Sequence, residues 1–327
     1  MQKHKIDKIG ILTSGGDAPG MNAAIRAIVR AADYHGIQAT GFVKGYSGLV
    51  QNEFVTLDNR SVSNIIQRGG TILRSARCKA FRTEEGQRQA ADNLRRNEID
   101  ALFIIGGDGS LKGAHTLSTH WSGQIIGLPG TIDNDLSGTD YTIGYFTALD
   151  TALDAIDKIR DTADSIERVF LIEVMGRMAG FIAAGAGVAG GAEEILVPEK
   201  AVDIDTLAAD IAIAKQRGKV SFILIVAEGA YPGGATALSA ELQKKSGIEC
   251  RPCILGYIQR GGSPAALDRI AATKLGAFSV EQALQGASGV MAGIIKNELV
   301  TTPLKQTWEN KKPLDPYLFE LQQIMAR

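Results

Sequence analysis

The 327-residue sequence lacks any excess of one charge: 35 basic and 36 acidic residues give a formal net charge of −1. Nucleic-acid-binding proteins usually carry a basic face, and no Lys/Arg-rich block occurs here, so we expect no nucleic-acid partner. Long hydrophobic runs are missing too. The apolar run 221–227 is far shorter than the ~20 residues that a membrane-spanning helix needs, and no signal-peptide-like stretch opens the chain. We therefore expect no membrane association.

Cysteine is scarce, whereas glycine is abundant. The three cysteines, Cys78, Cys250 and Cys253, form neither an even set for disulfides nor a zinc-binding pattern, which fits a reducing cytoplasm. Burial in a strand is the simpler explanation of the pair at 250 and 253. The 38 glycines lie in clusters, which indicates loops where the backbone must approach a ligand closely. The length predicts two domains or one large α/β unit.

Short apolar runs alternate with helical stretches along the chain. Residues 9–16, 101–110, 124–135, 169–177 and 221–229 each resemble a strand that runs into a loop. Strands buried on both faces read as continuous apolar runs, and their alternation with helices indicates parallel sheets. We therefore predict an α/β fold of two doubly wound, Rossmann-like, three-layer domains with mostly parallel sheets. The helices are expected at 21–33, 86–97, 146–159, 178–189 and 202–216.

Because ligands bind at the carboxyl ends of parallel strands, the loops carry the functional argument. Segment 13–26 places Gly15 and Gly16 between a strand and a helix, where backbone N–H groups favour a phosphate. Its spacing matches neither GxGxxG nor a Walker loop, which argues against a dinucleotide oxidoreductase; a plain βα turn also explains it. In segment 104–113, Asp108 offers one oxygen ligand for Mg²⁺, which typically takes one or two carboxylates plus phosphates and waters. A helix-capping role for Asp108 is the alternative.

The segment PGTIDNDLSGTD, residues 129–140, crowds Asp133, Asp135 and Asp140 together. Like charges this close resist joint ionisation unless a cation or a proton intervenes. Phosphoryl transfer needs a base near the acceptor hydroxyl and cations near the transferred group. We interpret Asp133 as this base and Asp135 as a supporting residue, facing a metal-holding Asp108. From the residues alone, Asx-turn chemistry explains the segment equally well.

Six segments together resemble the 6-phosphofructokinase family. In chain order they are LTSGGDAPGMNAAIR, GGT followed by SAR, IIGGDGS, GLPGTIDNDLSGTDYTIG, EVMGR and GYIQRGGSP, between about Ile6 and Val300. The final stretch, 301–327, adds no motif. The resemblance implies ATP-dependent phosphorylation of fructose 6-phosphate at its 1-hydroxyl, the regulated entry step of glycolysis, with Mg²⁺ as cofactor. The alternative is a nucleotide-sensing regulatory subunit of the same fold that has lost turnover.

The resemblance also assigns roles to individual positions. Asp133 would be the catalytic base, Arg177 would face the transferred phosphoryl group, and Asp108 would hold Mg²⁺. Bidentate arginines suit a phosphate dianion, although each arginine read alone is better explained as a surface charge or a salt bridge. ATP would meet Gly15, Arg77, Cys78, Gly107, Asp108, Gly109 and Ser110; the sugar phosphate would meet Thr131, Ile132, Asp133, Arg168, Met175, Gly176, Arg177, Glu228, Arg251, Tyr257 and Arg260, with Arg168 and Arg251 supplied by a neighbouring subunit.

The family resemblance further implies a homotetramer with an effector site for ADP or phosphoenolpyruvate between subunits. Arg26 and Arg30 are four apart and share a helix face, which suits a shared phosphate; an exposed basic stripe is the alternative. Asn59 stands where the family has an arginine, which predicts either weaker effector binding or substitution by Arg60. The matching positions are Arg26, Arg30, Asn59, Arg60, Arg160, Gly191, Glu193, Arg217, Lys219 and Ser221.

Four positions bear on substrate choice. Tyr257 stands where the family has a histidine; its phenol donates one hydrogen bond but is never cationic at neutral pH. Arg74 stands where many relatives have glycine, and either adds a positive charge near the ATP phosphates or points to solvent. Pyrophosphate-using relatives carry Asp and Lys in place of Gly109 and Gly130. Because those side chains would fill the space of a nucleotide's α-phosphate, we predict ATP as the donor.

A domain boundary near 139 is inferred from the glycines around that position. We expect 1–139 with about 257–300 to form an ATP-binding domain. The remaining residues, 140–256 with about 301–327, are expected to form a sugar-phosphate-binding domain.

Overall fold

The structure is a computed structural model that describes residues 5–326. These residues form two compact units. The first unit comprises the residues up to Thr147 together with Arg260–Lys312, and the second comprises Ala148–Gln259 with the residues from Pro313 on. Each unit is a mostly parallel sheet between two layers of helices, so the predicted fold class is confirmed. No helix within residues 5–326 combines the length and hydrophobicity needed to cross a membrane.

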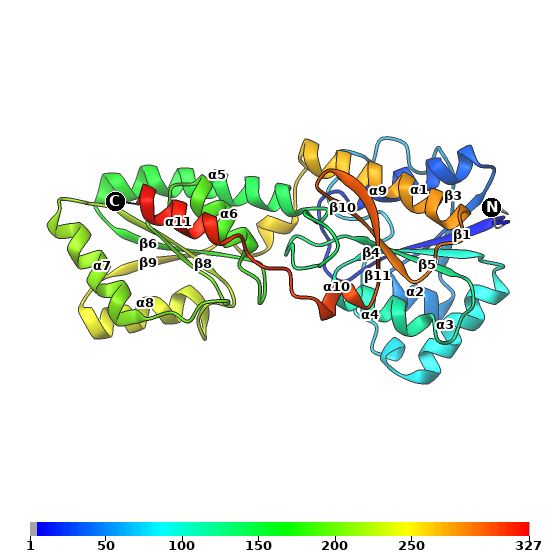
Figure 1. Ribbon diagram of the computed structural model, residues 1–327, viewed down its shortest axis with the longest axis horizontal. Coiled ribbons are helices and arrows are strands. Elements are labelled where there is room, and N and C mark those ends of the chain that lie inside the picture. The colour runs from blue at the N-terminus through cyan, green and yellow to red at the C-terminus, as the bar shows by residue number, and fades with distance from the viewer. Residues whose placement is uncertain (1–4, 327) are drawn as a thin grey trace. The chain divides into compact units, whose positions relative to one another are not determined.

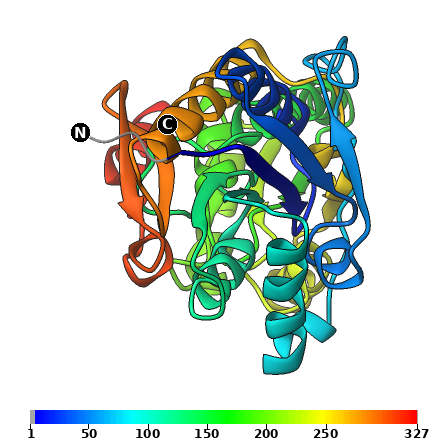
Figure 2. The same cartoon turned by 90° about the vertical axis from the view of Figure 1, so that its right-hand side faces the viewer.

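The first unit is built on a seven-stranded sheet with the order β11-β10-β5-β4-β1-β2-β3. Figure 2 shows β10–β11 at one edge and β2–β3 at the other. The inner strands are parallel, whereas β3 and β11 pair antiparallel at the edges. The strands are β1 (Lys8–Ser14), β2 (Gln38–Phe42), β3 (Phe54–Leu57), β4 (Ala101–Gly106), β5 (Gln124–Pro129), β10 (Val290–Ile295) and β11 (Glu298–Pro303).

Helices cover both faces of this sheet. On one face α1 (Met21–Tyr34) packs along α9 (Ala266–Leu284), as Figure 1 shows. They approach closely because Gly276 lies against the Ala24 carbonyl and Ala27 Cβ, where a Cβ at 276 would clash. The other face carries α2 (Tyr46–Gln51), α3 (Glu84–Arg96) and α4 (Asp108–Leu117), and the unit also contains η1 (Ala80–Arg82) and α10 (Gln306–Glu309).

The second unit has an entirely parallel four-stranded sheet with the order β7-β8-β6-β9. Its strand β8 is buried along its whole length, as the apolar run FILIVA predicts. The strands are β6 (Val169–Val174), β7 (Glu194–Leu196), β8 (Phe222–Ala227) and β9 (Cys250–Ile254). In Figure 1, α5 (Tyr145–Ile166), α6 (Phe181–Ala189) and α11 (Pro316–Met325) lie on one face, and α7 (Ile204–Gln216) and α8 (Gly234–Ser246) on the other; η2 (Gly256–Arg260) follows β9.

The unit boundaries differ from those expected near 139, 257 and 300. Residues up to Thr147 stay in the first unit because the Asp268 carboxylate accepts hydrogen bonds from the N–H groups of Gly144 and Thr147, at 2.9 and 2.8 Å. The segment after 300 also belongs there as far as Lys312, because β11 pairs with β10. The boundary inferred from the glycines near 139 therefore lies a few residues before the one in the structure, after Thr147.

Candidate active site

Three loops of the first unit meet where β1, β4 and β5 end. These strands are neighbours, and their registers align Ser14 with Gly106 and Gly106 with Pro129. The chain leaves β1 toward one edge of the sheet and β4 toward the other, which makes this the switch point where α/β sheets bind ligands. A Cβ on Gly15 would lie 3.3 Å from Ser110 Oγ, and one on Gly107 would lie 3.3 Å from Thr131 Cβ. The structure thus brings these predicted residues together.

A fourth segment, 71–78, docks onto the end of β1. Ser75 Oγ donates to the Gly15 carbonyl at 2.5 Å, and Thr13 Oγ1 donates to the Arg74 carbonyl at 2.9 Å. This places the exposed Arg77 and the half-buried Cys78 in the segment beside the glycine loop.

Arg74 is exposed and has a φ of 59°. Glycine adopts this left-handed conformation without steric cost, which explains the glycine expected at this position in relatives.

Of the two carboxylate oxygens of Asp108, one accepts a hydrogen bond from the described residues and the other does not. Its Oδ2 accepts from Lys112 Nζ at 2.9 Å, while Oδ1 is buried and accepts no hydrogen bond from residues 5–326. The helix-capping alternative does not hold, since Gly107 occupies the N-cap of α4. Within the described chain no group of three or more His, Cys, Asp or Glu side chains could hold a metal. A single carboxylate oxygen without a partner in that part of the chain, beside the glycine loops, instead fits a Mg²⁺ ion that is bound mainly through its substrate.

The loop after β5 holds Asp133 in a buried position. Its side chain is only 3% exposed, and its backbone N–H donates to Thr131 Oγ1 at 3.2 Å. Ile132 points into the core, so it can meet a ligand only through its backbone. Asn134 makes a longer-range contact across the same loop, because its Oδ1 accepts from the Thr142 N–H, eight residues on, at 3.0 Å. The segment therefore contains both a side chain that stabilises the loop, Asn134, and a buried carboxylate, Asp133.

The two glycines used to predict the phosphoryl donor differ in their surroundings. A Cβ on Gly109 would meet nothing within 4 Å, so the space above this residue is open. A Cβ on Gly130 would lie 2.8 Å from Ile105 and 3.1 Å from Met21. Packing inside the unit therefore already requires glycine at 130, and the argument for a nucleotide rests on Gly109.

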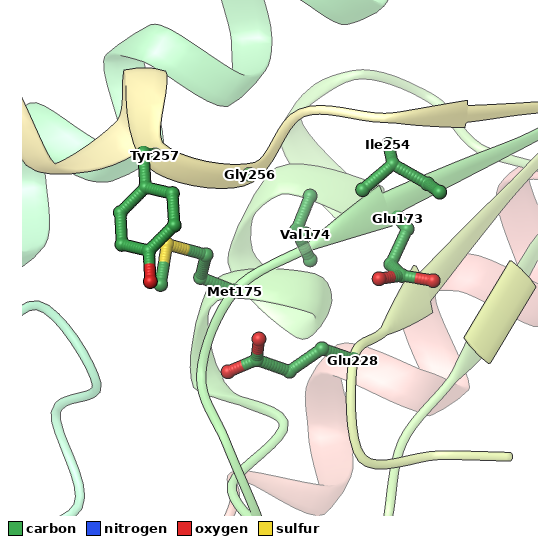
Figure 3. A pocket seen from close by; sticks show the side chains of 7 residues that line it. All are labelled: Glu173, Val174, Met175, Glu228, Ile254, Gly256 and Tyr257. Atoms are coloured by element: carbon green, nitrogen blue, oxygen red, sulfur yellow. The ribbon is translucent and has the colours of Figure 1, made fainter. Parts of the chain in front are cut away.

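The second unit contains a pocket of about 140 Å³ at the carboxyl ends of β6, β8 and β9. It includes three predicted residues, Met175, Glu228 and Tyr257, whose side chains lie around it in Figure 3. Glu173, which was not predicted, also lines the pocket but has a structural role, since it accepts from the Ala235 N–H at 2.6 Å at the start of α8. The remaining lining residues are Val174, Ile254 and Gly256.

The loop after β6 is strained and tied to its neighbours. Gly176 and Arg177 have φ values of 135° and 53°, and the Arg177 N–H donates to Glu228 Oε1 at 2.5 Å. Left-handed backbone at a non-glycine residue is costly and gathers at functional sites. The fully buried Gln259 joins the pocket's two sides, accepting from the Met175 N–H at 3.2 Å and donating to the Gly256 carbonyl at 3.1 Å.

The three arginines expected to grip the sugar phosphate do not line this pocket. Arg168 and Arg251 share Glu249, with N–O distances of 3.4 and 2.7 Å. Arg168 precedes β6, so it lies about 20 Å along the strand from the pocket end, at ~3.3 Å per residue. Arg260 belongs to the first unit, lies against Gly16 and donates to the Asp17 carbonyl at 3.1 Å.

The predicted effector residues form a cluster in the second unit. Glu193 is buried, accepts from Lys219 Nζ at 2.8 Å and lies 3.7 Å from Arg160, which also donates to the Gly190 and Gly191 carbonyls. Ser221 Oγ donates to Asp164, and Arg217 is exposed at the end of α7.

The first unit holds the other predicted effector residues. Arg26 and Arg30 lie on α1, where burial, followed by the charge of Arg30, lowers the pKa of Arg26. Asn59 donates to Asp33 of the same helix, while Arg60 is exposed beside it. The predicted effector residues thus form two groups, one in each unit.

Three residues near these sites were missed from the sequence. Tyr46 is buried, stacks on Phe81 and donates to the Ser110 carbonyl at 2.6 Å; burial raises the pKa of its phenol. Gln259 could have been noticed, because it lies inside the GYIQRGG segment. Lys312 contacts the loop of Asp133 from the terminal stretch that carries no motif, so no sequence signal could have found it.

Comparison with known proteins finds related chains over nearly the whole length. The family model described as Phosphofructokinase matches residues 8–283. ATP-dependent 6-phosphofructokinase 1 of Thermus thermophilus is 54% identical over 319 residues, covering 98% of this chain and 99% of its own. The ATP-dependent 6-phosphofructokinase of Bacillus pumilus is 49% identical with the same coverage. The phosphofructokinase structure from Saccharomyces cerevisiae matches with a TM-score of 0.86 and 36% identity, covering 98% of this chain; this chain spans only 48% of the yeast chain.

Proposed function

The chain belongs to the phosphofructokinase family, and we propose that it transfers the γ-phosphoryl group of ATP to the 1-hydroxyl of fructose 6-phosphate. The products are ADP and fructose 1,6-bisphosphate, which makes this the regulated entry step of glycolysis in the cytoplasm. One observation carries the proposal: the loops of Gly15, Gly107 and Thr131 meet at one sheet edge. Beside them lie an Asp108 oxygen without a hydrogen-bond partner among the described residues and the buried Asp133.

The first unit would bind ATP with its magnesium ion. Backbone N–H groups of the glycine loops would hold the phosphates, because glycine lets the backbone come close. Asp108 Oδ1 would hold Mg²⁺, and Arg77 and Cys78 would border the nucleotide. When bound, the ion supplies positive charge against the phosphates. The open space above Gly109 supports a nucleotide rather than pyrophosphate as the donor.

Asp133 would act as the general base. Its carboxylate takes the proton of the sugar 1-hydroxyl while the hydroxyl oxygen forms a bond to the γ-phosphorus. The bond from that phosphorus to the bridging oxygen breaks in line, and ADP leaves with its electron pair. No covalent enzyme intermediate forms, so catalysis comes mainly from positioning and charge stabilisation.

The pocket of the second unit would bind the sugar phosphate. Glu228 would accept hydrogen bonds from sugar hydroxyls, and Tyr257 would donate to the 6-phosphate. The tight turn at Gly176 would bring backbone of the loop after β6 close to the sugar, and Arg177 would stabilise the transferred phosphoryl group. The bond from the Arg177 N–H to Glu228 and the Gln259 contacts support a preformed binding surface.

A second copy of the chain would complete the sugar-phosphate site. Arg168 and Arg251 lie at the strand end opposite the pocket of their own unit, so they are free to serve a neighbouring subunit. Their shared partner Glu249 would hold the two guanidinium groups side by side, as two arginines gripping one phosphate require. This supports the homotetramer that the family resemblance implies.

ADP or phosphoenolpyruvate would regulate the enzyme at the effector residues. Lys219 and Arg160 flank the buried Glu193 carboxylate, which forms a cationic rim suited to a phosphate. Arg160→Ala should reduce both ADP activation and phosphoenolpyruvate inhibition at unchanged basal kcat. The matched control is Arg88→Ala, which removes an exposed arginine of α3. Unchanged regulation in Arg160→Ala would show that the effector site has been assigned wrongly.

A coupled assay of the purified protein tests the function directly. With fructose 6-phosphate, ATP should support turnover and pyrophosphate should not, and Gly109→Asp should sharply reduce ATP use because it sets a carboxylate against a phosphate. Robust pyrophosphate-dependent turnover in the unmodified protein contradicts the donor assignment. ATP binding without turnover indicates the alternative, a nucleotide-sensing regulatory subunit.

A further inference from the structure

The loop of Asp133 is held by a lysine from a distant part of the chain. We define the base loop as residues 131–142, which carries the proposed base between β5 and α5. Lys312 Nζ donates to Asn134 Oδ1 at 2.8 Å and to the Asp140 carbonyl at 2.5 Å. One ammonium group therefore joins the residue next to Asp133 to the far limb of the same loop.

Asn134 connects this lysine to the rest of the base loop. Its φ is 54°, so its backbone is in the left-handed region, and its side chain is almost completely buried. Its Oδ1 accepts from the Thr142 N–H as well as from Lys312, and Thr142 Oγ1 donates to the Thr131 carbonyl at 2.6 Å. Both limbs of the base loop are thus bonded through Asn134, the residue next to Asp133 in the chain.

The far limb of the base loop is docked on the elements that lead to Lys312. The Asp140 N–H donates to the Ile294 carbonyl at 2.7 Å, and Asp140 Oδ2 accepts from the Lys296 N–H at 2.6 Å. The Ser137 N–H donates to the Thr307 carbonyl at 3.0 Å. These contacts fix where the far limb lies, whereas the limb with Asn134 is joined to it by the Asn134 and Lys312 side chains.

The charge of Lys312 also suits its position. Burial lowers the pKa of Lys312 to about 8, and the nearby Asp140 and Asp135 carboxylates oppose that shift. A cation among these carboxylates offsets the repulsion that would otherwise spread the loop. The concentration of carboxylates in 129–140 is therefore matched by a positive charge that belongs to the chain itself.

We propose that Lys312 is a positioning residue for phosphoryl transfer, which fixes the base loop through Asn134 and Asp140 so that Asp133 meets the acceptor hydroxyl. The inference rests on the proposed function, because it assigns the base to Asp133. Lys312 itself touches neither substrate in this account.

The test compares Lys312→Met, Lys312→Arg and the matched control Lys311→Met, which changes the exposed neighbour. Methionine keeps most of the length of the side chain but removes the donors and the charge, whereas arginine keeps donors and a positive charge. We expect Lys312→Met to lower kcat by about 10- to 100-fold, since small misplacements of reacting groups cost that much, while KM for ATP stays within about twofold. Lys312→Arg should retain most of kcat, and Lys311→Met should match the wild type.

Amide hydrogen exchange supplies a readout that does not depend on turnover. The Thr142 N–H should exchange faster in Lys312→Met, because its acceptor Asn134 is no longer held. If Lys312→Met has the same kcat and the same Thr142 exchange rate as the wild type, the inference is wrong. It is also wrong if Lys311→Met loses as much kcat as Lys312→Met. If the methionine variant does not fold, Lys312→Gln is measured in its place. A wild-type protein without turnover overturns the proposed function and this inference together, whereas an active wild type with an equally active Lys312→Met overturns the inference alone.

Discussion

Tyr257 places a hydroxyl group at the rim of the second unit's pocket, with 83% of the residue exposed (Figure 3). In the proposed site this phenol supplies the hydrogen bond that the family resemblance assigns to a histidine at this position. Tyr257→Phe removes only that bond, which is worth about 0.5–1.5 kcal/mol, so KM for fructose 6-phosphate should rise about two- to tenfold at nearly constant kcat.

Steady-state kinetics with varied fructose 6-phosphate measure this change. Tyr317→Phe is the matched control, because Tyr317 is an exposed tyrosine of α11 that does not line the pocket. An unchanged KM in Tyr257→Phe would mean that the phenol makes no bond to the sugar phosphate.

Some site residues could be predicted from the sequence because short segments carry them. Asp108 and Asp133 lie in the loops that follow β4 and β5, and adjacent parallel strands end at one edge, so their approach is a consequence of topology. Gln259 and Lys312 act through contacts with residues 84 and 178 positions away. Such contacts depend on how separate elements pack, which local periodicity does not encode. The contact of Arg168 with Glu249, 81 positions away, escaped prediction for the same reason.

At the scale of the element, we expect the position of the base loop, and with it kcat, to depend on the protonation of Lys312. The pKa of Lys312 falls from an ordinary 10.5 to about 8, mainly through burial. As the pH rises through about 8, the ammonium loses its charge, its bonds to Asn134 and Asp140 weaken, and kcat should fall. Lys312→Arg should lack this alkaline limb, because guanidinium stays protonated.

The effect of Lys312 on the free energy of unfolding distinguishes a loss of kcat at alkaline pH from unfolding of the protein. Between pH 8 and 10.5 the unfolded chain holds a proton on Lys312 that the folded chain has released. The contribution of this group to the free energy of unfolding therefore increases with pH over that range. Chemical denaturation and kcat profiles, recorded together for both proteins, check the prediction; a kcat limb shared by Lys312→Arg contradicts it.

The five strands that read as long apolar runs were predicted, whereas the edge strands and the inner strands β2 and β10 were not. Strands such as β4 and β8 read as unbroken apolar runs because both faces are covered. Strand β9 has the sequence CRPCI, with a charge and a proline at a sheet edge, and β11 has the sequence ELVTTP, which is exposed or half-buried throughout. Edge strands tolerate both features, so their sequences resemble loops until the pairing partner is known.

At the scale of the whole molecule, two chains should share each active site. Asp133→Asn subunits keep Arg251, and Arg251→Ala subunits keep Asp133, so a mixed assembly should contain some intact sites. Co-expression of the two variants should restore about a quarter of wild-type activity if partners pair at random across a symmetric interface, although each variant alone is nearly inactive. Specific activity of the purified mixture is the measurement.

A second pair of variants is the control for this experiment. Arg177→Ala and Asp133→Asn both damage residues that the account assigns to one chain's own site, so their mixture should stay inactive. No restoration in the first pair would show that Arg251 serves its own chain. Restoration in the second pair would show that Asp133 and Arg177 act from different chains.

The most direct test of the central claim, that Asp133 is the base of an ATP-dependent sugar kinase, is the kcat of Asp133→Asn with saturating ATP and fructose 6-phosphate. Asparagine keeps the shape of the side chain but cannot accept the proton. The account predicts that kcat falls by about 10²- to 10⁴-fold, with KM for both substrates little changed. A near-normal kcat in this variant would contradict the account, because the buried carboxylate would then be part of the loop's architecture only.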